Sequence, residues 1–135
     1  MVNLFQLGNF KLHSGKLSCF RIICDALTDD DWGVLAYIIK ESLIDFKEVI
    51  GVPTGGDKLA KELEKYRKKV ADLTLVVDDV LTTGRSIKEI MDKVEGPVRG
   101  VVIFARNECP DGVASLFCMD YYSNKVLEFN MKPLG

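Results

Sequence analysis

The chain has 135 residues, of which 47% are hydrophobic and 28% charged, and its net charge is −2. This length predicts one domain, spanning residues 1–135, that can bury a hydrophobic core unaided. The small net charge gives no reason to expect nucleic acid or an anionic membrane as a partner. No apolar run approaches the roughly 20 residues that cross a bilayer, and the amino terminus does not resemble a signal peptide.

Cysteine usage points to a cytosolic protein with reduced thiols. The four cysteines show no C-x-x-C spacing, and one histidine is too few for an ordinary zinc site: Cys19, Cys24, Cys109 and Cys118, with His13. We therefore expect partly buried free thiols in the cytoplasm.

The first half of the chain alternates between strand and helix patterns. Residues 17–24 predict a strand. Thr28 and Asp31 have the spacing of a capping box, so a helix is expected to begin there. Residues 47–52 predict a short strand, and a glycine-rich loop leads to a helix over residues 57–69. The expected apolar faces of the two helices are Trp32, Leu35, Ile38, Ile39 and Leu43, and Leu59, Ala60, Leu63, Tyr66 and Val70.

The second half continues the alternation. The apolar run 73–77 predicts a buried parallel strand. A helical period of Ile87, Ile90, Met91 and Val94 follows, and Gly96-Pro97 predicts its end. Residues 98–104 predict the next buried strand, and 114–118 and 125–130 are strand candidates around a turn at Ser123-Asn124. The pattern predicts a three-layer α/β domain with a mainly parallel central sheet.

The strand over 73–77 is followed by residues that suit a phosphorylated sugar. Asp78 and Asp79 come at its carboxyl end, and the turn Thr82-Thr83-Gly84-Arg85-Ser86 leads into the next helix. Ligands of open α/β sheets bind at this edge, and the amides and hydroxyls of such a turn attract phosphate. The two carboxylates would repel phosphate unless they hold sugar hydroxyls or a divalent metal ion.

This ordered set resembles the 5-phosphoribosyl-1-diphosphate (PRPP) binding motif of the type I phosphoribosyltransferases. The resemblance implies that the turn 82–86 binds the 5′-phosphate. Asp78 and Asp79 would be the catalytic acids, which hold the ribose hydroxyls and steady Mg²⁺ indirectly. PRPP and a small base would be the substrates, and the family suggests a homodimer.

A second loop, in the segment GVPTGGDK, resembles the pyrophosphate loop of orotate phosphoribosyltransferases. By that resemblance Thr54, Gly55 and Gly56 supply amides, and Lys58 supplies charge. Lys58 is equally well interpreted as a solvated lysine in the first turn of a helix.

Two further segments resemble the orotate branch. Residues 10–20 resemble the amino-terminal segment that covers the base, which we place within residues 1–25. Residues 105–112 resemble the segment whose arginine, here Arg106, pairs with the carboxylate of orotate, and Thr82 matches a base contact. His13 replaces the pocket lysine of the family and is either a base contact or a partly exposed histidine. Arg21 and Ile22 stand where the family usually has aromatic residues.

The chain departs from the family between Gly56 and Leu73. Only 16 residues separate them, enough for one helix and a turn, so the flexible catalytic loop of the family is missing. The basic run 65–69 could supply substitute cations, or could be an exposed helix face. Two functions stay open: an orotate phosphoribosyltransferase-like enzyme of pyrimidine biosynthesis, or a weakly active or inactive PRPP- or nucleotide-binding module of the same fold.

Overall fold

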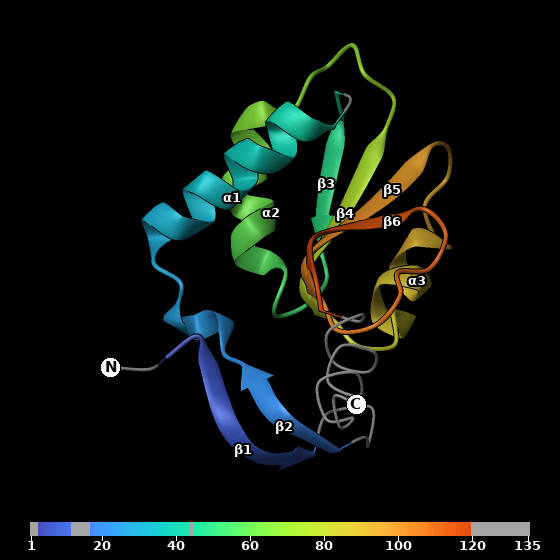
Figure 1. Cartoon of the computed structure of the whole chain (residues 1–135). Coiled ribbons are helices and arrows are strands. Elements are labelled where there is room, and N and C mark those ends of the chain that lie inside the picture. The colour runs from blue at the N-terminus through green and yellow to red at the C-terminus, as the bar shows by residue number, and fades with distance from the viewer. Residues whose placement is uncertain (1–2, 12–16, 44, 120–135) are drawn as a thin grey trace, which may run out of the picture.

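A parallel four-stranded sheet forms the centre of the computed structural model, which describes residues 3–11, 17–43 and 45–119 (Figure 1). Its strands follow one another in space as they do along the chain. All three neighbouring pairs are parallel. The strands are β3 (Glu48–Gly51), β4 (Thr74–Leu81), β5 (Val98–Ala105) and β6 (Val113–Cys118).

Helices cover both faces of the sheet. On one side lie α1 (Asp29–Ser42) and α2 (Asp57–Leu63), and on the other lies α3 (Arg85–Met91) (Figure 1). Alternate residues of β4 pack into hydrophobic clusters on opposite faces of the sheet, as expected for a strand that is buried on both faces. Leu75 and Val77 pack with α1 and α2, whereas Val76 packs with α3. The three-layer α/β architecture with a parallel sheet is therefore confirmed.

The first helix begins as the sequence predicts. Thr28 Oγ1 accepts a hydrogen bond from the Asp31 amide at 3.1 Å, and the Asp31 carboxylate accepts one from the Thr28 amide at 2.9 Å. One predicted core residue of this helix is wrong, since Ile38 is 39% exposed. The buried stripe of α1 runs instead through Trp32, Leu35, Ala36 and Ile39.

The second helix is shorter than predicted. After α2, a single 3-10 turn (η2, Glu64–Tyr66) ends the helical segment, and Arg67 is extended with ψ 142°. The Lys68 amide then donates to the Phe46 carbonyl at 2.8 Å, which turns the chain back toward the sheet. Val70, predicted to be buried, is 95% exposed for this reason.

An antiparallel hairpin precedes the sheet domain. Its strands are β1 (Phe5–Lys11) and β2 (Leu17–Ile22), and a short 3-10 turn (η1, Cys24–Ala26) joins it to α1. The hairpin lies beyond the carboxyl ends of the sheet strands (Figure 1). The strand β2 was predicted, whereas β1 was not, because its alternation is interrupted by a register shift between Leu7 and Phe10.

The tail is described only as far as residue 119. The strand predicted at 114–118 is confirmed as β6. The candidate strand at 125–130 and its turn at 123–124 lie outside the described residues. In the part of the chain that the structure describes, no helix is both long and apolar enough to cross a membrane.

Candidate active site

The strand that carries the two aspartates, β4, ends later in the chain than its sequence predicts. We predicted its end at Val77, but β4 runs through Leu81, so Asp78 and Asp79 lie within the strand. Pairing with β3 stops at Val77, whereas pairing with β5 continues to Leu81. The side of β4 next to both aspartates is therefore open to the loop that follows β3.

A cleft of about 840 Å³ lies at this edge of the sheet. It brings together residues from both predicted loops, the two aspartates and Arg106. The β1–β2 hairpin forms its other wall. From the sheet side its lining comprises Val52, Pro53, Thr54, Gly55, Asp78, Asp79, Val80, Thr82, Ser86 and Arg106, and from the hairpin Asn9, Phe10, Lys11, Arg21 and Ile22.

The two aspartates have one oxygen each fixed by the backbone. Asp78 Oδ1 accepts a hydrogen bond from the Asp79 amide at 2.8 Å, and Asp79 Oδ1 accepts one from the Val80 amide at 2.7 Å. Burial, reinforced by the neighbouring Asp79 carboxylate, raises the pKa of Asp78 to about 7. The pair is thus an acidic site in which one group titrates near neutral pH.

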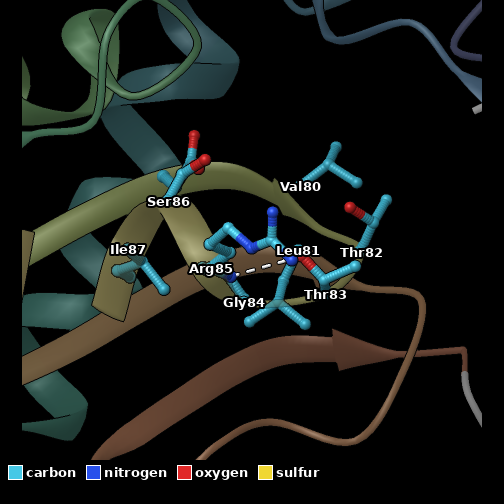
Figure 2. A pocket seen from close by; sticks show the side chains of 10 residues that line it. Val80, Leu81, Thr82, Thr83, Gly84, Arg85, Ser86 and Ile87 are labelled. Carbon is cyan, nitrogen blue, oxygen red and sulfur yellow. Dashed lines mark hydrogen bonds between the residues drawn. The ribbon is translucent and has the colours of Figure 1, made fainter. Parts of the chain in front are cut away.

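The turn after β4 encloses a small cavity of about 40 Å³ (Figure 2). A single water molecule needs about 10–15 Å³, so a group of several atoms can enter. All five predicted phosphate residues, Thr82 to Ser86, line it. Because Asp78, Val80, Thr82 and Ser86 line both spaces, this cavity is one end of the large cleft.

The shape of this turn depends on Gly84 and on a residue that sequence reasoning missed. Gly84 has φ +81°, a left-handed conformation that favours glycine, and Pro110 packs directly over it. Asn107 donates a hydrogen bond to the Thr82 carbonyl. Asn107 lies in the segment 105–112, which resembles the orotate-binding segment of the family, but no pattern in the sequence predicts this contact.

The loop after β3 contributes only part of the predicted pyrophosphate site. Thr54 and Gly55 line the cleft, and the peptide bond between Pro53 and Thr54 is cis. Gly56 is buried beneath them, where a side chain would overlap the Val77 carbonyl and the Val52 amide. Lys58 is exposed on α2 and does not line the cleft. Its interpretation as a solvated lysine is therefore the better one.

Arg106 lies at the end of β5 and is only 7% exposed. Its Nη1 donates to Ser18 Oγ at 3.1 Å and its Nη2 to the Phe20 carbonyl at 2.7 Å. The guanidinium also lies 4.1 Å from the centre of the Phe20 ring. Burial lowers the pKa of Arg106, and no acidic side chain pairs with it among the described residues. The positive charge of Arg106 is therefore not neutralised by an acidic side chain of the described residues, and this guanidinium is suited to bind an anionic ligand.

His13, the third predicted base contact, lies outside the described residues, as does the rest of the 12–16 connection. The hairpin residues on either side of it do line the cleft. Lys11, Phe10 and Arg21 were not predicted as ligand contacts, although Arg21 was noted as a departure from the family pattern.

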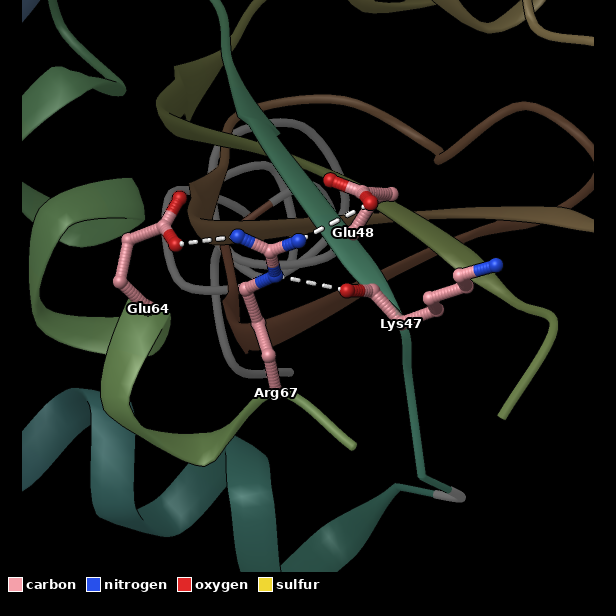
Figure 3. Close-up of polar contacts among 4 residues, drawn as sticks. All are labelled: Lys47, Glu48, Glu64 and Arg67. Carbon is pink, nitrogen blue, oxygen red and sulfur yellow. Dashed lines mark hydrogen bonds and ion pairs between the residues drawn. The ribbon is translucent and has the colours of Figure 1, made fainter. Parts of the chain in front are cut away.

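The basic run 65–69 lies at the opposite edge of the sheet. Arg67 donates to the Lys47 carbonyl at 2.7 Å and pairs with Glu48 and Glu64, both at 2.9 Å (Figure 3). Because Glu48 begins β3 and Lys47 directly precedes it, these contacts hold Arg67 at the amino end of the strand. The hypothesis that this run supplies substitute cations to the cleft is therefore wrong for Arg67.

Comparison with solved structures identifies the architecture. An orotate phosphoribosyltransferase from Aeropyrum pernix superimposes with a TM-score of 0.70 at 23% identity, over 96% of this chain and 94% of that one. The chain has the type I phosphoribosyltransferase fold.

Two further orotate phosphoribosyltransferases support this fold. The Mycobacterium tuberculosis structure, in complex with Fe(III) dicitrate, gives a TM-score of 0.66 at 16% identity over 86% of this chain and 90% of that one. The Francisella tularensis structure gives 0.59 at 17% identity, over 98% and 87%. No protein-family model matches the sequence, and no curated protein matches it. This chain therefore shares its fold with these phosphoribosyltransferases although the sequence identity is 23% or less.

Proposed function

We propose that this protein is a PRPP-dependent phosphoribosyltransferase that transfers the 5-phosphoribosyl group to a pyrimidine-type base and releases pyrophosphate. The observation that supports this proposal is the convergence of four elements on one cleft. These are the turn 82–86, the aspartate pair, the Thr54–Gly55 loop and the buried Arg106. Each suits one part of the substrates: the 5′-phosphate, the ribose, the pyrophosphate and an acidic base such as orotate.

The proposed chemistry needs positioning and charge stabilisation and no covalent nucleophile. The C1′–pyrophosphate bond breaks through an oxocarbenium-like sugar while a nitrogen of the base attacks C1′. Asp78 and Asp79 would hold the ribose hydroxyls beside the reacting carbon. Arg106 would orient the carboxylate of the acceptor, since its planar guanidinium can form parallel hydrogen bonds with a carboxylate.

The aspartate pair suits Mg²⁺ that is bound mainly by the phosphates of the ligand. Mg²⁺ usually takes one or two carboxylates together with substrate phosphates and water. Asp78 and Asp79 each keep one carboxylate oxygen that the backbone bonds above do not use. When bound, Mg²⁺ would neutralise charge on the departing pyrophosphate.

A second function is favoured by the connection between β3 and β4. After the Thr54–Gly55 loop, the connection forms α2 and η2 and then the Arg67 contacts at the amino end of β3, and none of these later residues lines the cleft. An open site admits water and loses donors to the leaving group, and loss of one such donor typically costs about 10²–10³ in rate. A binding module that holds PRPP or a nucleotide with little turnover is therefore the alternative.

Incubation with PRPP, Mg²⁺ and a panel of bases separates these functions. Release of pyrophosphate together with a nucleoside monophosphate would support the enzyme. Tight PRPP binding without turnover on any base would reject the enzyme and support the binding module. Absence of PRPP binding would reject both.

The aspartates provide a matched test of the site. Asp78→Asn/Asp79→Asn should weaken binding of PRPP and ribose 5-phosphate while the circular dichroism spectrum stays unchanged. Asp72→Asn is the control, because this exposed residue precedes the opposite end of the same strand. Equal ligand affinity of the double variant and the control would contradict the assignment of the acids.

The same proposal includes an oligomeric state and a cellular location. We expect a homodimer, which light scattering on the purified protein would test. We also place the protein in the cytoplasm, in agreement with its four free cysteines.

A further inference from the structure

The β1–β2 hairpin brings two cations to the cleft whose role the proposed function leaves open. Among the described residues, Lys11, Arg21 and Arg106 are the cationic side chains that line it. Arg106 already donates to Ser18 and Phe20 and is nearly buried. Lys11 and Arg21 are exposed side chains and therefore have more donors available to a ligand.

Arg21 is held in a defined orientation. Its Nε donates to Gln6 Oε1 at 2.8 Å, and its guanidinium carbon lies 4.4 Å from the centre of the Phe10 ring. The Phe10 ring lies over Gly8, where a Cβ atom would come within 2.9 Å of it. Both terminal nitrogens of Arg21 remain without a side-chain partner in the described structure. A cation fixed in this way loses little conformational entropy when it binds an anion.

Along the chain, Arg21 lies between residues that contact Arg106 and a residue beside Asp79. Ser18 and Phe20 contact Arg106 at the end of β5. Beyond Arg21, the chain reaches Cys24, whose pKa is raised to about 12 by burial and by the Asp79 carboxylate beside it. Asp79 in turn lies against Gly55 of the loop after β3. Arg21 lines the same cleft as Asp79 and the Thr54–Gly55 loop.

The part of the cleft next to Asp79 and the Thr54–Gly55 loop needs positive charge to bind a diphosphate. Asp78 and Asp79 are acidic, Thr54 and Gly55 carry no charge, and Lys58 does not line the cleft. We propose that Arg21, with Lys11 as a second cation, binds the diphosphate group of the ligand. The hairpin then supplies from a fixed position the charge that neutralises the leaving group. This inference rests on the proposed function and assigns to it a residue that the family pattern does not.

Three probes test the assignment: PRPP, inorganic pyrophosphate and ribose 5-phosphate, each titrated with Mg²⁺ into the purified full-length protein. Arg21→Gln should weaken binding of PRPP and pyrophosphate by about 10- to 100-fold, the value of a charge-assisted hydrogen bond. Ribose 5-phosphate, which lacks the diphosphate, should bind as before. Arg21→Lys should recover part of the loss, and Lys11→Gln should show the same pattern with a smaller effect.

Arg99→Gln is the matched control, since Arg99 is an exposed arginine near the amino end of β5. It should leave all three affinities unchanged. The assignment is overturned if Arg21→Gln binds pyrophosphate like the control, or if it loses affinity only for the acceptor base. If Arg21→Gln lowers the melting temperature, its affinities no longer test the assignment, and Arg21→Lys and Lys11→Gln are used instead. The assignment is then overturned if both of these variants bind pyrophosphate as tightly as the unaltered protein. Failure of the unaltered protein to bind any of the three probes would instead refute the proposed function.

Discussion

The carboxylate of Asp79 lies directly against the backbone of Gly55, so that any side chain at position 55 would overlap it. This contact joins the aspartate pair on β4 to the loop after β3. It explains how a residue of β4 and a loop after the neighbouring strand can line one cleft.

Gly55→Ala should therefore displace Asp79 and weaken PRPP binding by about 10-fold or more, as expected when a charged contact to the ligand is lost. Isothermal titration would measure the change. Gly33→Ala is the control, because the nearest atom to a Cβ there is Glu62 Oε2 at 3.8 Å. In the interior of α1 this replacement should stabilise the fold by about 0.5–1 kcal/mol and leave binding intact. A Gly55→Ala protein with normal affinity would refute the contact as a determinant of the site.

The raised pKa of Asp78 predicts a decrease in stability with pH. The folded protein holds this proton more tightly than the unfolded chain, whose aspartates titrate near 3.8. The stabilising contribution is therefore complete below about pH 3.8 and is lost as the pH rises through about 7.

Urea unfolding at pH 5 and pH 8 measures this contribution. Asp78→Asn should lose less stability between these pH values than the unaltered protein, by about 1–2 kcal/mol after allowance for partial solvent exposure. The same pH dependence in both proteins would show that Asp78 does not titrate in this range.

Arg106 connects β5 to the hairpin, so its loss should loosen the hairpin before it affects the sheet. Arg106→Met removes two hydrogen bonds from a charged donor and should destabilise the protein by about 2 kcal/mol. Amide hydrogen exchange should become faster in residues 17–22, with β4 and β5 little changed. Arg106→Lys keeps the charge without the two-donor geometry and should give an intermediate result. Uniformly faster exchange in all strands would contradict a local role.

The basic run after α2 should matter for stability and not for ligand binding. Arg67→Ala removes contacts to Glu48, Glu64 and the Lys47 carbonyl, and a small decrease in melting temperature is expected. The affinity for PRPP should stay the same, since these contacts lie at the amino end of β3. A marked loss of PRPP affinity would place this run at the cleft after all.

Local chemistry was enough to predict several features. The capping box at Thr28, the β-branched run of β4 and the turn 82–86 each depend on neighbouring residues, and all three are found as expected. The end of the second helix could not be predicted in this way. Its helical pattern continues to Val70, but the contact between Lys68 and Phe46 stops the helix earlier.

The sequence by itself determined the order of strands and helices from β2 to β6 and the position of the turn 82–86, because hydrophobic periodicity and turn chemistry act over a few residues. Only the tertiary structure decided which charges face the cleft. It separated Lys58 and Arg67 from the cleft, joined Arg106 to Ser18 and Phe20 across 86 to 88 positions of sequence, and added Arg21. The physical reason is that these contacts depend on how the hairpin and the sheet pack together, and no local pattern encodes that packing.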